Sequence, residues 1–181
     1  MTNPRANPRP INRQSLEDMA LVYVARFATS AVKLDAYLRR KLRERGWAGD
    51  EEPPVAAIVA RFVAAGYIDD AAYARAKTGS LLRRGYGARR IAQALGAAGI
   101  AEDLRSDARA SVAEQRRAAL ALARKRGFGP FGRTLPDRAL RERQVAAMLR
   151  AGHPLDSARK LVDAADQDAA LEWAAQADEE T

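Results

Sequence analysis

The sequence contains no cysteine and only one histidine, His153, among its 181 residues. A chain without thiols forms no disulfide framework and offers no thiolate to a metal ion. A metal enzyme needs several convergent ligands, and a nucleophilic hydrolase needs a base beside its nucleophile. The sequence suggests neither arrangement, so we expect no catalytic residue, no metal site and no cofactor, and we expect the protein to act by binding.

Long apolar runs are also missing. The first 14 residues, MTNPRANPRPINRQ, contain three prolines and three arginines but no apolar core of a signal peptide. No later stretch approaches the roughly 18 apolar residues that a membrane-spanning helix requires. Together with the lack of cysteine, this predicts a cytoplasmic protein that makes no contact with a membrane.

Aromatic residues are scarce, at 6%, whereas alanine is abundant. Strands favour aromatic and β-branched side chains, and alanine favours helices. No segment shows the alternation of apolar and polar residues that is typical of a strand. With 48% hydrophobic and 30% charged residues the chain can bury a core and cover it with solvated groups. These features predict an all-α fold.

Acidic residues gather at the C-terminus. Seven of the 23 acids lie within residues 163–181, a stretch that has no lysine or arginine. The preceding residues carry all 31 basic side chains and 16 acids, a formal charge of +15. A body this basic attracts polyanions or a partner with an acidic face. We interpret residues 167–181 as a solvated acidic tail, which could alternatively compete for the basic surface.

Three glycines reveal an internal repeat. Gly46, Gly99 and Gly152 follow one another at intervals of 53 residues, and each ends a predicted helix. The register continues on both sides of the glycine. Core-type residues precede it by four and eight positions, with Gln144 as the exception, and an aspartate that could start the next helix follows it by four. These positions are Leu42, Leu95 and Met148; Leu38, Ile91 and Gln144; and Asp50, Asp103 and Asp156.

Helical periodicity predicts three helices in each repeat. In the first, Ala20, Tyr23, Val24 and Phe27 form one apolar stripe, and two further stripes follow before Gly66. Either acid of the GYIDD segment, Asp69 or Asp70, can cap the first helix of the second repeat. We therefore predict a flexible basic arm at 1–16, three-helix units at 17–68, 69–113 and 114–166, and the tail. Neighbouring units would share faces in an elongated, curved array.

The segment RRGYGARR, residues 83–90, carries the most suggestive local pattern. Two arginine pairs flank a Gly-Tyr-Gly turn, so backbone, guanidinium groups and a ring could approach a phosphate chain together. The segment lacks the Lys-Ser/Thr ending of a nucleotide-binding P-loop. It is equally compatible with a glycine-rich connection between helices whose arginines face water.

Two other basic runs, at 37–46 and 121–127, also precede a glycine turn. Cations at a helix C-terminus are stabilised by about 0.3 to 1 kcal/mol whatever the function. The shared position nevertheless allows the three runs to line one face of the protein as a continuous basic surface. The predicted contact residues for a protein partner or nucleic acid are Arg83, Arg84, Arg89 and Arg90, with Arg40, Arg43, Arg124 and Arg126 as further candidates. His153 follows a helix stop, where Trp47 and Ile100 stand in the other repeats, and we expect it to pack at the turn.

Three stretches carry a resemblance to a known family. They are YLRRKLRERGW at 37–47, FVAAGYIDDAAYARAKTGSLLRRGYGARRIAQALGAAGI at 62–100, and VAAMLRAGHPLDSARKLV at 145–162. The sequence resembles the RecX family of regulators of the RecA recombinase, over nearly all of residues 17–165. The resemblance implies a protein that binds RecA, lies along the groove of the RecA filament on single-stranded DNA, and restrains ATP hydrolysis, LexA-type co-cleavage and strand exchange.

The favoured hypothesis is therefore a monomeric modulator of the RecA filament in DNA repair and the SOS response. A rival hypothesis is a general DNA-binding protein that acts without RecA, since three-helix units with basic ends resemble helix-turn-helix modules. The rival predicts tight DNA binding by the protein alone, with an affinity that falls steeply as salt rises.

Overall fold

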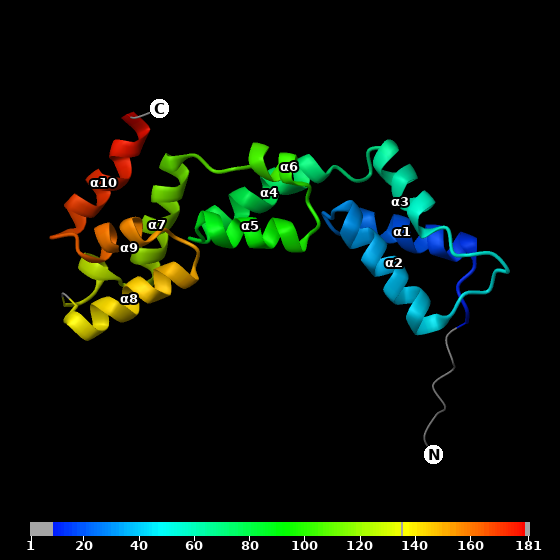
Figure 1. The fold of residues 1–181 in the computed structure, drawn as a ribbon, viewed down its shortest axis with the longest axis horizontal. Coiled ribbons are helices and arrows are strands. Elements are labelled where there is room, and N and C mark those ends of the chain that lie inside the picture. Colours follow the sequence, from blue (N-terminus) through cyan, green and yellow to red (C-terminus); the bar gives the residue numbers. More distant parts are fainter. Residues whose placement is uncertain (1–8, 135, 180–181) are drawn as a thin grey trace, which may run out of the picture. The chain divides into compact units, whose positions relative to one another are not determined.

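We analysed a computed structural model, which describes residues 9–134 and 136–179. This part of the chain forms ten α-helices and one short 3-10 turn, and it contains no β-strand beyond an isolated bridge between Ile11 and Trp47 (Figure 1). The predicted all-α fold is confirmed. Among the described residues, no helix is both long and apolar enough to cross a membrane.

The helices fall into two compact units. Unit 1 runs to Tyr73 and also contains Ala98–Ile100, and unit 2 consists of Ala74–Ala97 and the residues from Ala101 onward. Unit 1 contains α1 (Arg13–Arg26), α2 (Ala31–Arg45), α3 (Val55–Ala64) and the first turn of α4 (Asp70–Arg83). The rest of α4 belongs to unit 2, with α5 (Ala88–Ala97), α6 (Glu102–Asp107), α7 (Val112–Arg126), η1 (Gly129–Phe131), α8 (Arg138–Arg150), α9 (Leu155–Val162) and α10 (Gln167–Glu179). The three-unit division of the repeat stays a prediction.

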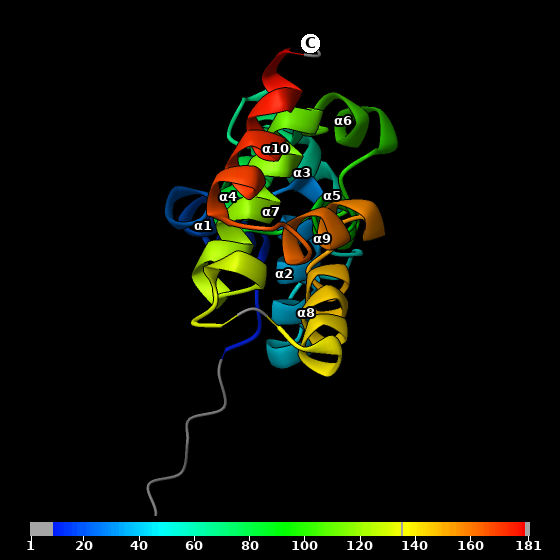
Figure 2. The same ribbon diagram turned by 90° about the vertical axis from the view of Figure 1, so that its left-hand side faces the viewer.

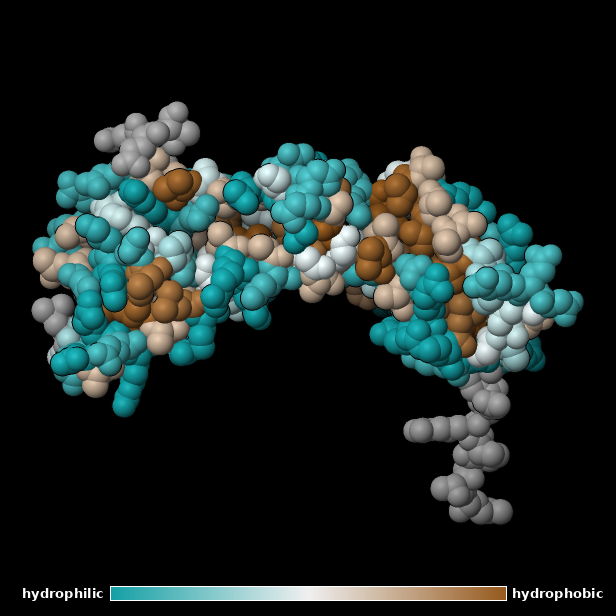
Figure 3. All heavy atoms as spheres, viewed as in Figure 1, coloured by the Kyte–Doolittle hydropathy of each residue, from teal (hydrophilic) through white to brown (hydrophobic). Residues whose placement is uncertain are grey.

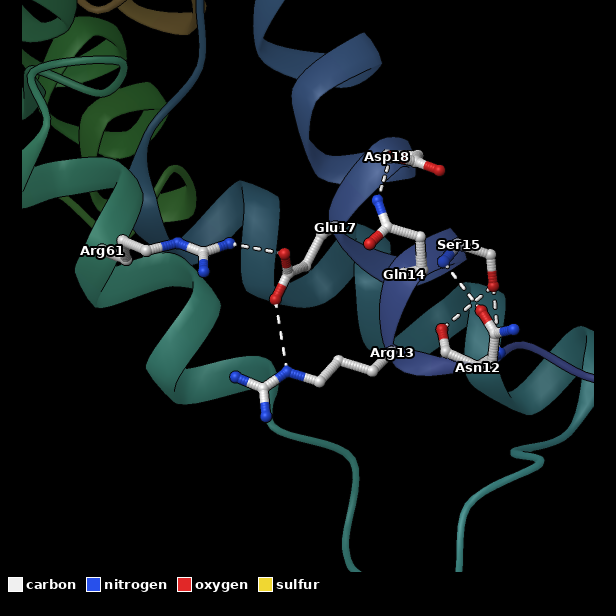
Figure 4. Close-up of polar contacts among 7 residues, drawn as sticks. All are labelled: Asn12, Arg13, Gln14, Ser15, Glu17, Asp18 and Arg61. Atoms are coloured by element: carbon white, nitrogen blue, oxygen red, sulfur yellow. Dashed lines mark hydrogen bonds and ion pairs between the residues drawn. The ribbon is translucent and has the colours of Figure 1, made fainter.

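The beginning of α1 corrects the predicted arm. Asn12 caps the helix by accepting a hydrogen bond from the Ser15 backbone, and the Ser15 hydroxyl accepts one from the Asn12 backbone, each at 2.9 Å (Figure 4). Ile11 and Leu16 are fully buried. Residues 11–16 thus belong to the folded unit, because two apolar side chains anchor them. Residues 1–8 of the predicted arm lie outside the described residues.

A small core joins α1, α2 and α3. Leu16, Leu34, Leu38 and Ile58 are its centre. The predicted stripe of α1 is wrong at Phe27, which lies in extended backbone at the helix end and is 55% exposed. Other large apolar side chains of this unit are also exposed, and Figure 3 shows hydrophobic surface over it.

A carboxylate on α1 links that helix to α3. Glu17 accepts hydrogen bonds from Arg61 on α3, at 2.9 Å, and from Arg13, at 3.4 Å (Figure 4). The hydrogen bond from Arg61 is the main reason why the pKa of Glu17 lies below its ordinary value.

Polar groups fix the N-terminus of α2. The buried Ser30 hydroxyl donates to the Ala98 carbonyl at 2.6 Å, and Asp70 accepts from the Ala31 backbone at 2.9 Å. The other acid of the GYIDD segment, Asp69, accepts from the Ala72 backbone at 2.8 Å and caps α4. The expected cap of α4 is therefore Asp69.

The repeat glycines behave as predicted, whereas one of the aspartates does not. Gly46, Gly99 and Gly152 have φ angles of +80°, +71° and +97°, and each follows the end of a helix. Asp103 and Asp156 lie in the first turns of α6 and α9. Asp50 starts no helix, because α3 begins only at Val55 after the two prolines.

The exception in the apolar register, Gln144, has a structural explanation. Its side chain is buried and accepts a hydrogen bond from the Gly129 backbone at 2.8 Å. Gly129 belongs to η1, a turn between α7 and α8. An apolar residue at position 144 would leave that buried N–H without this acceptor.

The interpretation of residues 167–181 as a solvated tail is wrong over the part described. Residues 167–179 form α10, which packs against α7 (Figure 2). Ala170, Ala174 and Ala177 are buried at this contact, and the Arg116 guanidinium donates to the Trp173 carbonyl at 3.1 Å. Small residues at helical spacing allow the two helices to approach closely, so Asp168 and Glu172 belong to a folded helix.

The first helix of the third predicted unit also begins earlier than expected. α7 starts at Val112, and Ser111 and Glu114 form a reciprocal capping box at its N-terminus. The preceding helix, α6, is short and ends at Asp107.

Candidate functional site

The RRGYGARR segment contains the last residue of α4, the connection at 84–87 and the first turn of α5. Its backbone is hydrogen-bonded to the turn that follows α8: the Gly87 N–H donates to the Ala151 carbonyl at 2.9 Å, and the Arg89 N–H donates to the Gly152 carbonyl at 3.2 Å. The two turns therefore lie against each other within unit 2.

Glycine is required in this contact because the two backbones approach closely. A Cβ atom on Gly87 would lie 2.4 Å from the carbonyl carbon of Gly152, and one on Gly85 would lie 3.0 Å from Leu122. Gly85 also has a φ of +83°. The expectation that the turn's backbone approaches a phosphate chain is thus wrong for Gly87, whose N–H is already bonded within the fold.

His153 belongs to the contact between these two turns, which we call the junction. The side chain is buried, and Nε2 lies 2.9 Å from the Gly85 carbonyl oxygen. Burial lowers the pKa of His153 below its ordinary value, and the hydrogen bond to Gly85 opposes that shift only in part. The burial of His153 agrees with the expectation that it packs at the turn.

A basic pocket of about 440 Å³ opens beside this junction. Its lining includes five cationic side chains, two aromatic rings and no acid. The cations are Arg84, Arg90, Lys125, Arg126 and Arg150, and the rings are those of Tyr86 and Phe128. We call this site the basic groove.

Three separate parts of unit 2 supply these cations. Arg84 follows the end of α4 and Arg90 lies in the first turn of α5. Lys125 and Arg126 end α7, and Arg150 ends α8. The ends of α7 and α8 carry the negative ends of their helix dipoles, which stabilise these three cations locally. The contact of Gly87 with Gly152 joins the first and third of these parts, and Gly85 lies against Leu122 of α7.

The charges of the basic groove are not neutralised within the fold. None of its five cations makes an ion pair in the described part of the chain. Elsewhere in unit 2, Arg105 pairs with Glu102 and Arg141 pairs with Asp163. All five cations are exposed, and the Arg84 guanidinium lies 5.3 Å from the Tyr86 ring centroid. The groove can therefore bind a polyanion without first breaking an internal pair.

A second pocket adjoins the first. It has a volume of about 330 Å³, shares Arg126 and Phe128 with the basic groove, and adds Arg133 and Arg143 to the cationic lining. Its lining also contains no acid. We call the two pockets together the basic track.

Comparisons with known proteins decide the family. The chain is 35% identical over 167 residues to "Regulatory protein RecX" of Myxococcus xanthus (strain DK1622), an alignment that covers 86% of this chain and 88% of the relative. The chain belongs to the RecX family. The family model "RecX, second three-helix domain" matches residues 69–108, which include the RRGYG turn.

The RecX fold is also found by structural comparison. The crystal structure of RecX from Lactobacillus salivarius matches with a TM-score of 0.64 at 18% identity, covering 83% of this chain and 96% of that one. The resemblance inferred from the three sequence stretches is thus confirmed at the level of family and fold.

Only some of the predicted contact residues meet in this RecX-family fold. Arg84, Arg90 and Arg126 line the basic groove. Arg83 lines a different pocket with Glu114, Arg89 is directed to the Leu149 carbonyl at 3.5 Å, and the Arg124 guanidinium lies 5.7 Å from the Phe131 ring centroid. Consecutive side chains in and beside a helix point in different directions around its axis, so one member of each RR pair lines the groove.

Arg40 and Arg43 belong to α2 in unit 1. Arg40 lies 3.6 Å from the Glu44 carboxylate and 5.6 Å from the Tyr37 ring centroid, so its charge is partly compensated. Arg43 is exposed and contributes to lowering the pKa of Glu44, whose main cause is the hydrogen bond from Lys41. Both arginines remain predicted contact residues.

The selection from the sequence missed Lys125, Arg150 and the two arginines of the adjoining pocket. Lys125 lies inside the basic run 121–127, and Arg150 precedes the Gly152 turn. Both therefore show the pattern of a cation before a glycine turn, which identified the other predicted contact residues. Arg133 and Arg143 gave no such signal, because only the fold brings them to the adjoining pocket.

The described residues contain no group of three or more histidine, cysteine or acidic side chains that could hold a metal ion.

Proposed function

We propose that this RecX-family chain binds RecA and RecA–DNA filaments and lowers RecA ATPase, strand exchange and co-protease activity. The observation that carries the proposal is the 35% identity to a protein named regulatory protein RecX over 86% of the chain. The protein would act in the cytoplasm as a monomer, by binding and without catalysis.

Charge supports this proposal. The +15 body favours an acidic protein surface or DNA, both of which a RecA filament on DNA presents. The unpaired cations of the basic groove are the surface best suited to that contact. The predicted residues that lie outside the groove, Arg83, Arg89, Arg124, Arg40 and Arg43, are proposed as secondary contacts.

The test is a titration of RecA on single-stranded DNA with the purified protein, with ATP hydrolysis as the readout. Inhibition at substoichiometric ratios is expected, because one bound molecule affects neighbouring subunits of a filament. Unchanged hydrolysis at saturating protein would refute the proposal.

The basic groove is also compatible with the rival hypothesis of a DNA-binding protein that acts without RecA. The rival expects equal affinity for naked DNA and for RecA-coated DNA, whereas a filament regulator binds the coated DNA more tightly. Measuring both affinities at the same salt concentration separates the two.

A further inference from the structure

The basic track has the features of a path for a chain of phosphates. Its two pockets share Arg126 and Phe128, so their linings are continuous. Seven cationic side chains line it and no carboxylate does. A ligand with one isolated charge would leave most of these cations unused, whereas a polymer with regularly repeated negative charge can meet them in succession.

The backbone that carries the cations of the basic groove is fixed before any ligand arrives. Lys125, Arg126 and Arg150 stand at helix ends, and the close contact of Gly87 with Gly152 fixes α5 against the end of α8. Arginine presents a rigid fork that matches the oxygens of a phosphate. Anchoring the backbone reduces the ordering that binding requires.

Aromatic rings distinguish nucleic acid from an acidic protein surface as the ligand. Tyr86 and Phe128 are partly exposed among the cations. Base stacking on an aromatic ring stabilises single-stranded complexes by about 1 to 3 kcal/mol per base and tolerates any sequence. An acidic peptide would gain no comparable contact from Tyr86.

We propose that the basic track binds one strand of nucleic acid, with consecutive phosphates against Arg90, Arg126 and Arg150 and with a base against the Tyr86 ring. In a duplex the bases are stacked inside and cannot reach the ring, so the site prefers single strands. This inference goes beyond the proposed function and beyond general DNA binding, because it specifies a single strand, the cations that meet its phosphates and the ring that meets a base, and it does not depend on RecA.

The first test measures fluorescence anisotropy of a labelled oligothymidylate with the full-length protein and no RecA. The variant R90E/R126E/R150E is compared with R75E/R109E/R159E, which makes the same charge change at exposed, unpaired arginines of unit 2 outside the track. Circular dichroism and thermal unfolding establish that both variants are folded.

The track variant should bind at least about tenfold more weakly than the control variant, with a shallower dependence of affinity on salt, because fewer phosphates are neutralised. Equal affinities of the two variants would overturn the proposal, as would a wild-type protein that does not bind the oligonucleotide.

The second test separates stacking from charge. Wild-type protein should bind the oligothymidylate more tightly than a base-free deoxyribose phosphate oligomer of the same length, and more tightly than a duplex. Tyr86→Leu should weaken the preference for bases, with Phe128 as the remaining ring of the track, and Tyr86→Phe should keep it, since both rings stack. An unchanged preference in Tyr86→Leu, or tighter binding of duplex, would overturn the assignment of the strand.

RecA ATPase is measured with the same variants as an independent readout. Loss of oligonucleotide binding by the track variant supports the strand site whatever the ATPase result. Failure of the wild-type protein to inhibit RecA would refute the proposed function alone, because the strand-binding experiments contain no RecA.

Discussion

His153 Nε2 lies 2.9 Å from the carbonyl oxygen of Gly85, which joins the turn after α8 to the turn after α4. The carbonyl can only accept, so Nε2 carries the proton in this contact. The imidazole is buried. A second proton would place a charge where the protein gives it little solvation.

The first prediction concerns pH. Burial lowers the pKa of His153 in the folded state below the ordinary value of 6.5, so the unfolded chain binds more protons as the pH falls. The free energy of unfolding should therefore be constant above about pH 7.5 and should decrease as the pH drops through 6.5. Chemical denaturation at a series of pH values measures this.

His153→Gln is the matched variant for the pH prediction. Its amide can donate to the Gly85 carbonyl but does not titrate, so its unfolding free energy should change little between about pH 7.5 and 5.5. The same pH dependence in this variant and in the wild-type protein would contradict the role of His153.

Much of this junction could be predicted from the sequence, and some of it could not. The 53-residue spacing located Gly99 and Gly152 as helix stops, because a left-handed turn favours glycine. The partner of His153 was not predictable, since Gly85 lies 68 residues away and only the fold brings them together. The contact of Gly87 with Gly152 was not predictable for the same reason, and the sequence left open whether the turn binds a phosphate chain or only connects two helices.

Two other predictions, the solvated tail and the start of the third unit, were wrong although the sequence carries a local signal for the correct structure. Ala170, Ala174 and Ala177 repeat at helical spacing, which was a readable stripe within the supposed tail. Ser111 and Glu114 match a capping box. The basic groove was only half predictable, because the sequence identifies RR pairs but not which arginine of each pair faces the pocket.

A second prediction tests the close approach of the two turns. Gly87→Ala should destabilise unit 2 by about 1 to 3 kcal/mol, since its Cβ would lie 2.4 Å from the Gly152 backbone, which cannot move aside cheaply. Thermal unfolding measures the change. Gly96→Ala is the control, because its Cβ meets only the flexible end of Arg105 at 3.5 Å, and it should stabilise α5 by about 0.5 to 1 kcal/mol. Equal stability of the two variants would contradict this explanation of the turn.

The third prediction concerns α10. Ala174→Asp would bury a carboxylate at the contact with α7 and should cost about 3 kcal/mol or more, whereas Ala175→Asp adds the same charge on the exposed side and should cost less than about 1 kcal/mol. Urea unfolding of both variants measures the difference. Similar midpoints would mean that residues 167–179 are not docked in solution.

The last prediction separates arginines that the sequence treats alike. R84E/R90E and R83E/R89E make the same charge change within one segment of eight residues, yet only the first pair lines the basic groove. If the groove is the main contact with the filament, R84E/R90E should require at least about tenfold more protein for half-inhibition of RecA ATPase, and R83E/R89E should require only a few-fold more. Titrations at two salt concentrations check this, because the difference should shrink as salt screens the charges. Equal effects of the two pairs would show that net charge, and not the arrangement in the groove, governs the interaction.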